Sequence, residues 1–234
     1  MNVFDVMGPV MVGPSSSHTA GAVKIGLTAR KLLQEEVLSA DILLHGSFLA
    51  TGRGHGTDKA LIAGLLGMKP DDERIPNSFQ IADELGMKYT FSGTELRHAH
   101  PNSVLLKLKG RAGRELEVIG SSQGGGAIKI NKIDGLDANF CACYPTLIVH
   151  NADQPGHISE VTTLLAKHGI NIATMQLYRD KRGGRAVMVL ECDQEIASQV
   201  IHTLEKMEGI LKVTYLSLEE KDEFSIIGRD HKKK

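Results

Sequence analysis

Tryptophan is absent from this chain of 234 residues, and aromatic residues together make up only 4% of it. A chain with so few rings offers little surface on which nucleic-acid bases can stack. The sequence also lacks an excess of positive charge, because its formal net charge is −1. Nucleic-acid-binding domains are typically basic. These two absences predict that the chain has no nucleic-acid partner.

Long apolar runs are absent as well. No stretch approaches the roughly 18 uninterrupted apolar residues of a membrane-spanning helix. A polar run at 15–19 interrupts the early apolar region that a secretory signal needs. The chain has only three cysteines, which is typical of an intracellular protein with free thiols. We therefore expect a cytoplasmic protein that does not associate with membranes.

The cysteines argue against a metal centre. Cys141 and Cys143 are closer together than the usual Cys-x-x-Cys spacing, and only Cys192 remains to complete a site. His98 and His100 would share one face of a strand, but no cluster of Cys, Asp or Glu lies near them in the sequence. We expect no metal ligand in this chain and interpret the three cysteines as structural thiols.

Hydrophobic residues amount to 41% of the chain, enough for one large or two small domains. Before a seam at 139–145, strand-like and helix-like runs alternate in an α+β pattern. The predicted elements are strands at 41–49, 87–92, 103–109, 115–119 and 127–131 and helices at 57–67 and 76–85. The sequence thus predicts domains at 1–143 and 146–222 and a polar, flexible tail at 223–234.

The predicted elements of the second domain follow the order β-α-β-β-α-β, which is the ferredoxin-like arrangement. An apolar strand at 146–151 precedes a helix with Val161 and Leu165 on one face. Such a sheet carries its helices on one face and leaves the other face or an edge free. We expect this free surface to pair with a second copy, which predicts a homodimer.

The motif GPSSSHT at 13–19 opens a segment with helical spacing. The first N–H groups of a helix have no intrahelical partner, and the helix dipole favours negative charge there. Polar side chains at that place can cradle a carboxylate or a phosphate. The candidates are Ser15, Ser16, Ser17, His18 and Thr19. A serine-rich N-cap that only starts the helix is an equally good interpretation.

The motif GRGHGTD at 52–58 lies between a predicted strand and a predicted helix. Its glycines let the backbone bend sharply, so His55 would stand at the tip of the turn. Histidine titrates near neutral pH and is suited to proton abstraction. A surface-loop histidine without a chemical role is the alternative interpretation.

A second glycine-rich segment, SSQGGG at 121–126, is predicted to be a flexible turn between two strands. Its backbone amides could form an anion-binding nest, although a plain connecting loop explains the sequence at least as well.

The segment NADQPGHI at 151–158 joins the first strand of the second domain to its first helix. Asn151 or Asp153 can accept an ammonium group or cap the helix, and exposed N–H groups at the helix start can hold a carboxylate. An amino acid matches both ends. An ordinary loop with an aspartate cap is the alternative.

These segments together resemble the β subunit of the iron–sulfur-dependent bacterial L-serine dehydratase, over nearly the whole chain. The similar parts are FDVMGP at 4–9, GPSSSHTAG at 13–21, GSF at 46–48, GHGTD at 54–58 and HPN at 100–102. The half from Thr146 resembles an ACT domain, including its DQPG turn at 153–156. One departure is SSQGGG, where the family usually has an apolar residue before the glycines.

The resemblance implies a reaction and a division of labour. L-serine is converted to pyruvate and ammonia by loss of water through an enamine. A [4Fe–4S] cluster acts as a Lewis acid on the serine hydroxyl, and its cysteine ligands belong to a partner α subunit. The resemblance implies that His55 is the base that removes the Cα proton. It also implies that Ser15, Ser16, Ser17, His18, Thr19 and Asn102 line the substrate side.

For the ACT half, the resemblance implies effector binding, with serine as the natural ligand. The residues concerned are Asn151, Asp153, Gln154, Pro155, Gly156, His157 and Ile158. Two other functions compete with the catalytic one. The chain could be a non-catalytic regulator that senses an amino acid, or a fragment related to phosphoglycerate dehydrogenases, although it has no G-x-G-x-x-G fingerprint after a strand.

Overall fold

The structure is a computed structural model, and it describes residues 10–52 and 54–217. The FDVMGP segment at 4–9 and the predicted tail at 223–234 lie outside the described residues. No helix in the described part of the chain has both the length and the apolar character that crossing a membrane requires.

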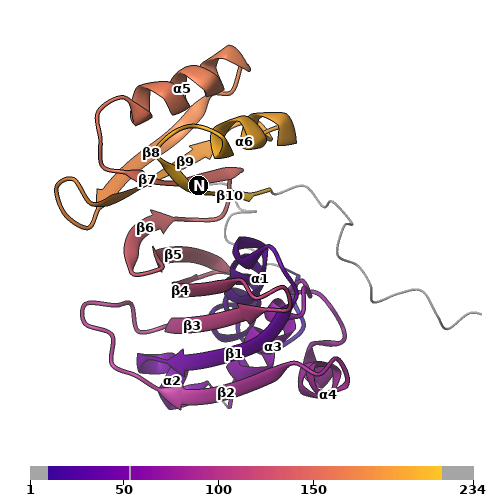
Figure 1. The fold of residues 1–234 in the computed structure, drawn as a ribbon. Coiled ribbons are helices and arrows are strands. Elements are labelled where there is room, and N and C mark those ends of the chain that lie inside the picture. The colour runs from indigo at the N-terminus through magenta and orange to yellow at the C-terminus, as the bar shows by residue number, and fades with distance from the viewer. Residues whose placement is uncertain (1–9, 53, 218–234) are drawn as a thin grey trace, which may run out of the picture.

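The first part of the chain is built on a six-stranded sheet with the order β2-β1-β3-β4-β5-β6 (Figure 1). Its strands are β1 (Val37–Leu44), β2 (Lys88–Gly93), β3 (Ser103–Gly110), β4 (Glu115–Gly124), β5 (Ala127–Ile133) and β6 (Leu136–Phe140). β1 and β2 are parallel, and the other neighbours are antiparallel. The α+β prediction is therefore confirmed, although strand β6 was not predicted.

The helices of this part are α1 (Gly21–Leu33), α2 (Gly46–Thr51), α3 (Thr57–Leu65) and α4 (Ser78–Glu84). A π-helical turn, Ser16–Ala20, leads directly into α1, and a short 3₁₀ turn, Ile75–Asn77, precedes α4. The predicted helices at 57–67 and 76–85 are thus present with small shifts at their ends.

The strand predicted at 41–49 is wrong beyond Leu44, because the chain there turns into helix α2. Gly46 makes this turn in the left-handed region, with φ of +55°. It also packs against Pro101, where a Cβ on Gly46 would lie only 2.5 Å from the Pro101 carbonyl oxygen. Hydrophobic spacing cannot separate a short helix from a strand in such a run. As a result, the segment that holds His55 follows a helix and not a strand.

Helices α1 and α3 cross with their backbones in contact. A Cβ placed on Gly26 would lie 2.5 Å from the carbonyl oxygen of Leu61, and one on Gly64 would lie 2.1 Å from that of Val23. Only glycine permits so close an approach at the crossing. The polar motifs at 13–19 and 52–58 directly precede these two helices, so the crossing fixes how far apart the motifs stand.

The second part of the chain holds a four-stranded antiparallel sheet with the order β10-β7-β9-β8. Its elements are β7 (Thr146–Ala152), α5 (His157–Lys167), β8 (Ile172–Arg179), β9 (Arg185–Cys192), α6 (Ser198–Glu205) and β10 (Ile210–Leu216). This order confirms the predicted β-α-β-β-α-β arrangement.

Both faces of this second sheet are covered. Leu147 and Val149 share a core with α5 and α6, whereas Ile148 and Val187 belong to the core of the first part of the chain. In Figure 1 the second sheet accordingly stands against β6 and α1, with its helices on the far side. Of the two free surfaces that were expected, a face or an edge, the free face is therefore wrong, and β10 and β8 are the edge strands. Strand β9 is buried from Ala186 to Cys192, as expected of a strand with a core on each side.

Candidate active site

The motif at 13–19 forms a hydrogen-bonded turn at the start of helix α1. Ser15 has extended backbone dihedrals and caps the turn, since its Oγ accepts a hydrogen bond of 3.1 Å from the His18 N–H. The hydroxyl oxygens of Ser15 and Ser17 lie 3.3 Å apart. Ser15 therefore acts as the N-cap of the turn. The side chains of Ser17, His18 and Thr19 are not used in capping and make other contacts.

The imidazole of His18 is held by hydroxyl groups on both of its nitrogens. Nδ1 lies 3.1 Å from Ser17 Oγ, and Nε2 lies 3.1 Å from both Ser47 Oγ and Thr51 Oγ1. The ring also meets Phe48 edge to face, with centroids 5.4 Å apart. Four neighbours thus fix the orientation of this half-buried ring.

His55 lies next to His18, with the two ring centroids 5.1 Å apart. The Thr19 hydroxyl donates a 3.1 Å hydrogen bond to the main-chain carbonyl of His55, which ties its turn to the start of α1. The ring of His55 itself is exposed. We name Ser15, Ser17, His18, Ser47, Thr51 and His55 the hydroxyl–histidine cluster.

Charge in the cluster is limited by the proximity of the two rings. Burial lowers the pKa of His18 below its ordinary value, the neighbouring His55 lowers it further, and a contact with Ser47 offsets part of the effect. His18 is therefore neutral at neutral pH. A neutral imidazole can donate through one nitrogen and accept through the other, which suits its hydroxyl neighbours.

Ser16 and Asn102 take part through their main chains. The Ser16 carbonyl accepts the N–H of Gly21, which closes the π-helical turn. The Asn102 carbonyl accepts a 2.9 Å hydrogen bond from the Ser122 N–H, while Pro101 accepts one of 2.8 Å from Ser47. The HPN segment thus supports α2 and β4. Sequence analysis missed Ser47 and Thr51 as partners of His18, because nothing in the sequence signals a contact across about thirty residues.

The segment at 121–126 differs from the predicted flexible turn, because Ser121 to Gly124 continue strand β4. Ser122 is fully buried, and its Oγ has no hydrogen-bond partner among the described residues. It packs against the start of α1, where a Cβ on Gly21 would lie 2.2 Å from Ser122 Oγ. The glycines that follow, Gly124 and Gly125, turn the chain with positive φ.

The turn at 151–158 has two buried polar side chains. Asn151 is 3% exposed and His157 is 7% exposed. Asn151 Oδ1 and His157 Nε2 have no hydrogen-bond partner in the described ranges. The His157 ring packs against Gly209, since a Cβ there would lie 2.4 Å from both Cε1 and Nε2 of the ring. Buried polar atoms without partners are uncommon in folded proteins.

The other residues predicted at this turn are placed differently. Asp153 Oδ2 accepts a 2.8 Å hydrogen bond from the Gly183 N–H and pairs with Arg179 at 3.2 Å, so it joins the turn to the β8–β9 hairpin. It does not cap α5, whose N-cap is Gly156. The more exposed members are Gln154, Pro155, Gly156 and Ile158.

Comparison with known proteins identifies both parts of the chain. Residues 2–89 match the family model described as serine dehydratase beta chain, and residues 145–209 match the ACT domain. The L-serine dehydratase beta chain of Peptoniphilus asaccharolyticus is 39% identical over 218 residues, which cover 93% of this chain and 98% of that one. This chain belongs to the L-serine dehydratase beta-chain family.

Other relatives agree with this assignment to the beta chains of an L-serine ammonia-lyase. The probable L-serine dehydratase beta chain of Bacillus subtilis is 40% identical over 216 residues, or 92% of this chain and 98% of that one. A D-3-phosphoglycerate dehydrogenase of Archaeoglobus fulgidus is 30% identical over 218 residues, but these cover only 39% of the dehydrogenase. The beta chains match over nearly their whole length, whereas the likeness to the dehydrogenase covers less than half of that protein.

The cysteines of this beta chain do not fit an iron–sulfur cluster. The described residues contain no group of three or more His, Cys, Asp or Glu placed to hold a metal ion. The Cys141 thiol donates to Glu191 Oε1 at 3.3 Å, and burial raises the pKa of this thiol to about 12. Cys192 is fully buried, and its pKa is raised to about 11.

Proposed function

We propose that this chain is the β subunit of a two-chain enzyme that converts L-serine to pyruvate and ammonia, and that the partner α chain ligates a [4Fe–4S] cluster. The observation that carries the proposal is the pair of imidazoles, His18 and His55, 5.1 Å apart, with hydroxyl groups at both ring nitrogens of His18. A protein that only senses an amino acid has no need of such a pair. When bound in the partner, the cluster would act as a Lewis acid on the serine hydroxyl.

Substrate binding is assigned to the start of helix α1. The Ser15 and Ser17 hydroxyls can donate to the carboxylate of L-serine, and the positive end of the helix dipole favours a negative group there. Ser16 contributes its main chain, and Thr19 positions His55 through the hydrogen bond to its carbonyl. Asn102 supports this arrangement through β4.

His55 is assigned as the general base. Its exposed ring can reach a substrate, while His18 is held by four neighbours and stays neutral beside it. His55 takes the proton from Cα, and the electron pair left behind forms the Cα–Cβ double bond as the Cβ–O bond breaks. The departing hydroxide takes up a proton from solvent and leaves as water, an enamine remains, and His55 returns its proton to solvent. The enamine tautomerises to an imine, and its hydrolysis gives pyruvate and ammonia.

Anaerobic co-expression with the α chain tests the proposal. We expect pyruvate to form from L-serine only when both chains are present. Full activity of the α chain alone would contradict it and would make this chain a regulator.

A second function is favoured by the turn at 151–158. We propose that it binds an amino acid, L-serine in the first instance, because the unpartnered Asn151 Oδ1 can accept from an ammonium group and the N–H groups at the start of α5 can hold a carboxylate. Isothermal titration of the full chain with L-serine should give heat that the Asn151→Leu variant loses. The absence of heat with any amino acid would leave this domain with a structural role only.

We also propose that the chain forms a homodimer through β8, in place of the covered sheet face. β8 is an edge strand on which Met175 and Leu177 are 42% and 44% exposed. An exposed edge with apolar side chains favours pairing with another chain. Light scattering should give the mass of a dimer for the full chain and of a monomer for Met175→Lys with Leu177→Lys. An unchanged mass would contradict the proposed interface.

A further inference from the structure

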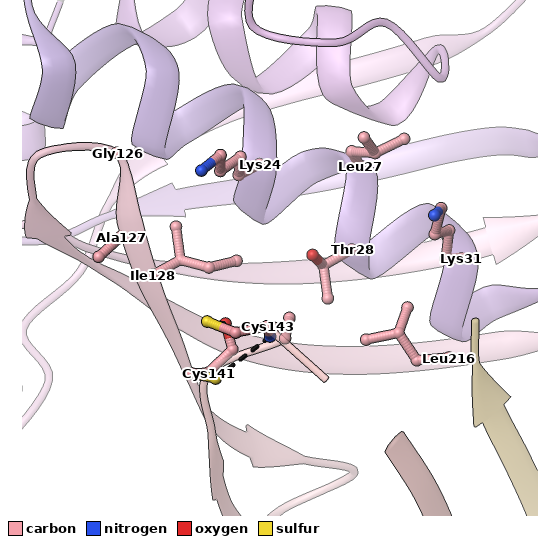
Figure 2. Close-up of a pocket in the computed structure, with 11 residues that line it drawn as sticks. Lys24, Leu27, Thr28, Lys31, Gly126, Ala127, Ile128, Cys141, Cys143 and Leu216 are labelled. Carbon is pink, nitrogen blue, oxygen red and sulfur yellow. Dashed lines mark hydrogen bonds between the residues drawn. The ribbon is translucent and has the colours of Figure 1, made fainter. Parts of the chain in front are cut away.

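A cavity of about 320 Å³ lies between helix α1 and the junction of the two sheets. Figure 2 shows α1 on one side of it, bearing Lys24, Thr28 and Lys31, with Cys143 and Leu216 on the other. Its size is at the lower end of the range of about 300–1,000 Å³ typical of small-molecule sites. None of the lining residues belongs to the hydroxyl–histidine cluster.

The described residues that line this cavity carry positive charge. Lys24 and Lys31 are seven residues apart, which is about two helical turns, so both project from the same side of α1. No acidic residue is among the described residues that line the cavity. Lys31 Nζ donates a 3.2 Å hydrogen bond to the carbonyl of Ser217, and Lys24 has no ion-pair partner within 10–52 and 54–217. A bound anion would pair with the Lys24 ammonium group.

The remaining walls are mostly apolar. Leu27, Ile128, Ala142 and Leu216 supply carbon surface, and the Thr28 hydroxyl is a further donor between the two lysines. An anion without carbon would leave that surface without contacts, whereas an organic anion would bury its own apolar part there. The walls and the charge together select an anion with a short carbon body.

We propose that this cavity binds a small organic carboxylate, with the carboxylate at Lys24 and Thr28 and the carbon chain against Ile128 and Leu216. The site would be formed by α1 and β5 of the first part of the chain, by the segment 141–143 that joins the two parts, and by Leu216 of β10. Binding does not depend on the partner chain or on the proposed reaction.

Protection of Cys143 provides the test, because this thiol is exposed and lines the cavity. The full chain, in a Cys141→Ser background, is treated with iodoacetamide at increasing concentrations of butyrate, and labelling of Cys143 is followed by peptide mass. We expect saturable protection by butyrate, and half-saturation by inorganic phosphate at a concentration at least tenfold higher. A lack of protection, or equal protection by phosphate, would overturn the proposal.

Matched variants make the test specific. Lys24→Met should raise the half-saturating butyrate concentration at least tenfold, and Lys31→Met serves as a second variant if the first does not fold. Lys206→Met removes the same charge from an exposed position at the end of α6 and should leave protection unchanged. Equal protection in Lys24→Met and Lys206→Met would contradict the assigned site. The assay measures no turnover, so failure of the proposed enzyme function would not affect its result.

Discussion

The hydroxyl–histidine cluster and the turn at 151–158 both lie where helices begin, and the hydrogen bonds of their side chains are satisfied in different ways. In the hydroxyl–histidine cluster, His18 and its serine and threonine neighbours bond to one another at 3.1 Å. In the turn at 151–158, Asn151 Oδ1 and His157 Nε2 are buried without partners among the described residues. The cluster is preorganised, so its geometry does not wait for a ligand. The turn at 151–158 carries a desolvation cost of about 1–3 kcal/mol per atom until something supplies the missing partner.

Among the substitutions in the hydroxyl–histidine cluster, the largest loss of activity is expected at His55. With the α chain present, His55→Ala should reduce kcat by about 10²–10⁴-fold, because a general base contributes that much to proton abstraction. Steady-state pyruvate formation measures the change, and the spectrum of the iron–sulfur cluster should stay the same. His98→Ala, which removes an exposed histidine elsewhere, should leave kcat unchanged. Normal turnover by His55→Ala would reject this residue as the base.

The next largest effect, on both stability and activity, is expected at the crossing of helices α1 and α3. Gly64→Ala would place a methyl group 2.1 Å from the Val23 carbonyl, so α1 and α3 must move apart. Overpacking of this kind costs about 1–3 kcal/mol, and we expect a lower free energy of unfolding in urea together with a lower kcat. Gly54→Ala adds the same methyl group with 3.5 Å of room and should cost less. Equal losses in the two variants would show that the crossing is not tight.

In the turn at 151–158, removing a polar side chain should raise the free energy of unfolding instead of lowering it. Asn151→Leu removes a buried acceptor without a partner. It also removes the 2.6 Å hydrogen bond from Asn151 Nδ2 to the Ala152 carbonyl, but that carbonyl keeps its 2.9 Å hydrogen bond from the Gln154 N–H. We expect the free energy of unfolding to rise by about 1 kcal/mol as amino-acid binding disappears. Asn171→Leu, which removes an exposed side chain bonded to Asp193, should give no such gain. A loss of stability in Asn151→Leu would mean that a partner such as water already satisfies Oδ1.

The smallest effect concerns pH. Burial lowers the pKa of His150 below its ordinary value, and Lys212 and Arg185 lower it further, while Asp134 acts against them. The folded state therefore binds fewer protons than the unfolded state, so stability falls as the pH drops through about 6.5, the unfolded value. His150→Gln should lose less stability than the wild type between pH 7.5 and 5.5 in urea unfolding. The exposed His202→Gln is the control, and an equal loss in His150→Gln and wild type would contradict the argument.

Sequence patterns predicted the second sheet better than the first. The βαββαβ order could be predicted because alternation or an apolar run marks each strand and helical spacing marks each helix. The coverage of both faces could not be predicted. A mainly apolar run such as 186–192 indicates that both sides of the strand are buried, but it does not indicate which elements cover them. In the first part, the turn at Gly46 depends on a contact with Pro101 that lies far away in the sequence.

The candidate site was predicted in its parts and not in its assembly. Ser15, Ser17, His18 and His55 stand out as polar residues in glycine-rich or helix-starting segments. Their proximity depends on the crossing of α1 and α3, and the role of Ser47 and Thr51 depends on a helix that the sequence did not reveal. Contacts between segments decide both, and one sequence carries no direct signal for them.

The π-helical turn Ser16–Ala20 has a consequence for how this region can vary. An α-helix advances by about 100° per residue, so deleting one residue from the wider turn would rotate everything before it by about that angle. The face of α1 that packs in the core, with Ala22, Ile25 and Ala29, would keep its position. The packing of α1 and the direction in which the serines point can therefore vary separately. A single insertion or deletion in the π-helical turn would redirect the serines and leave the packing of α1 unchanged.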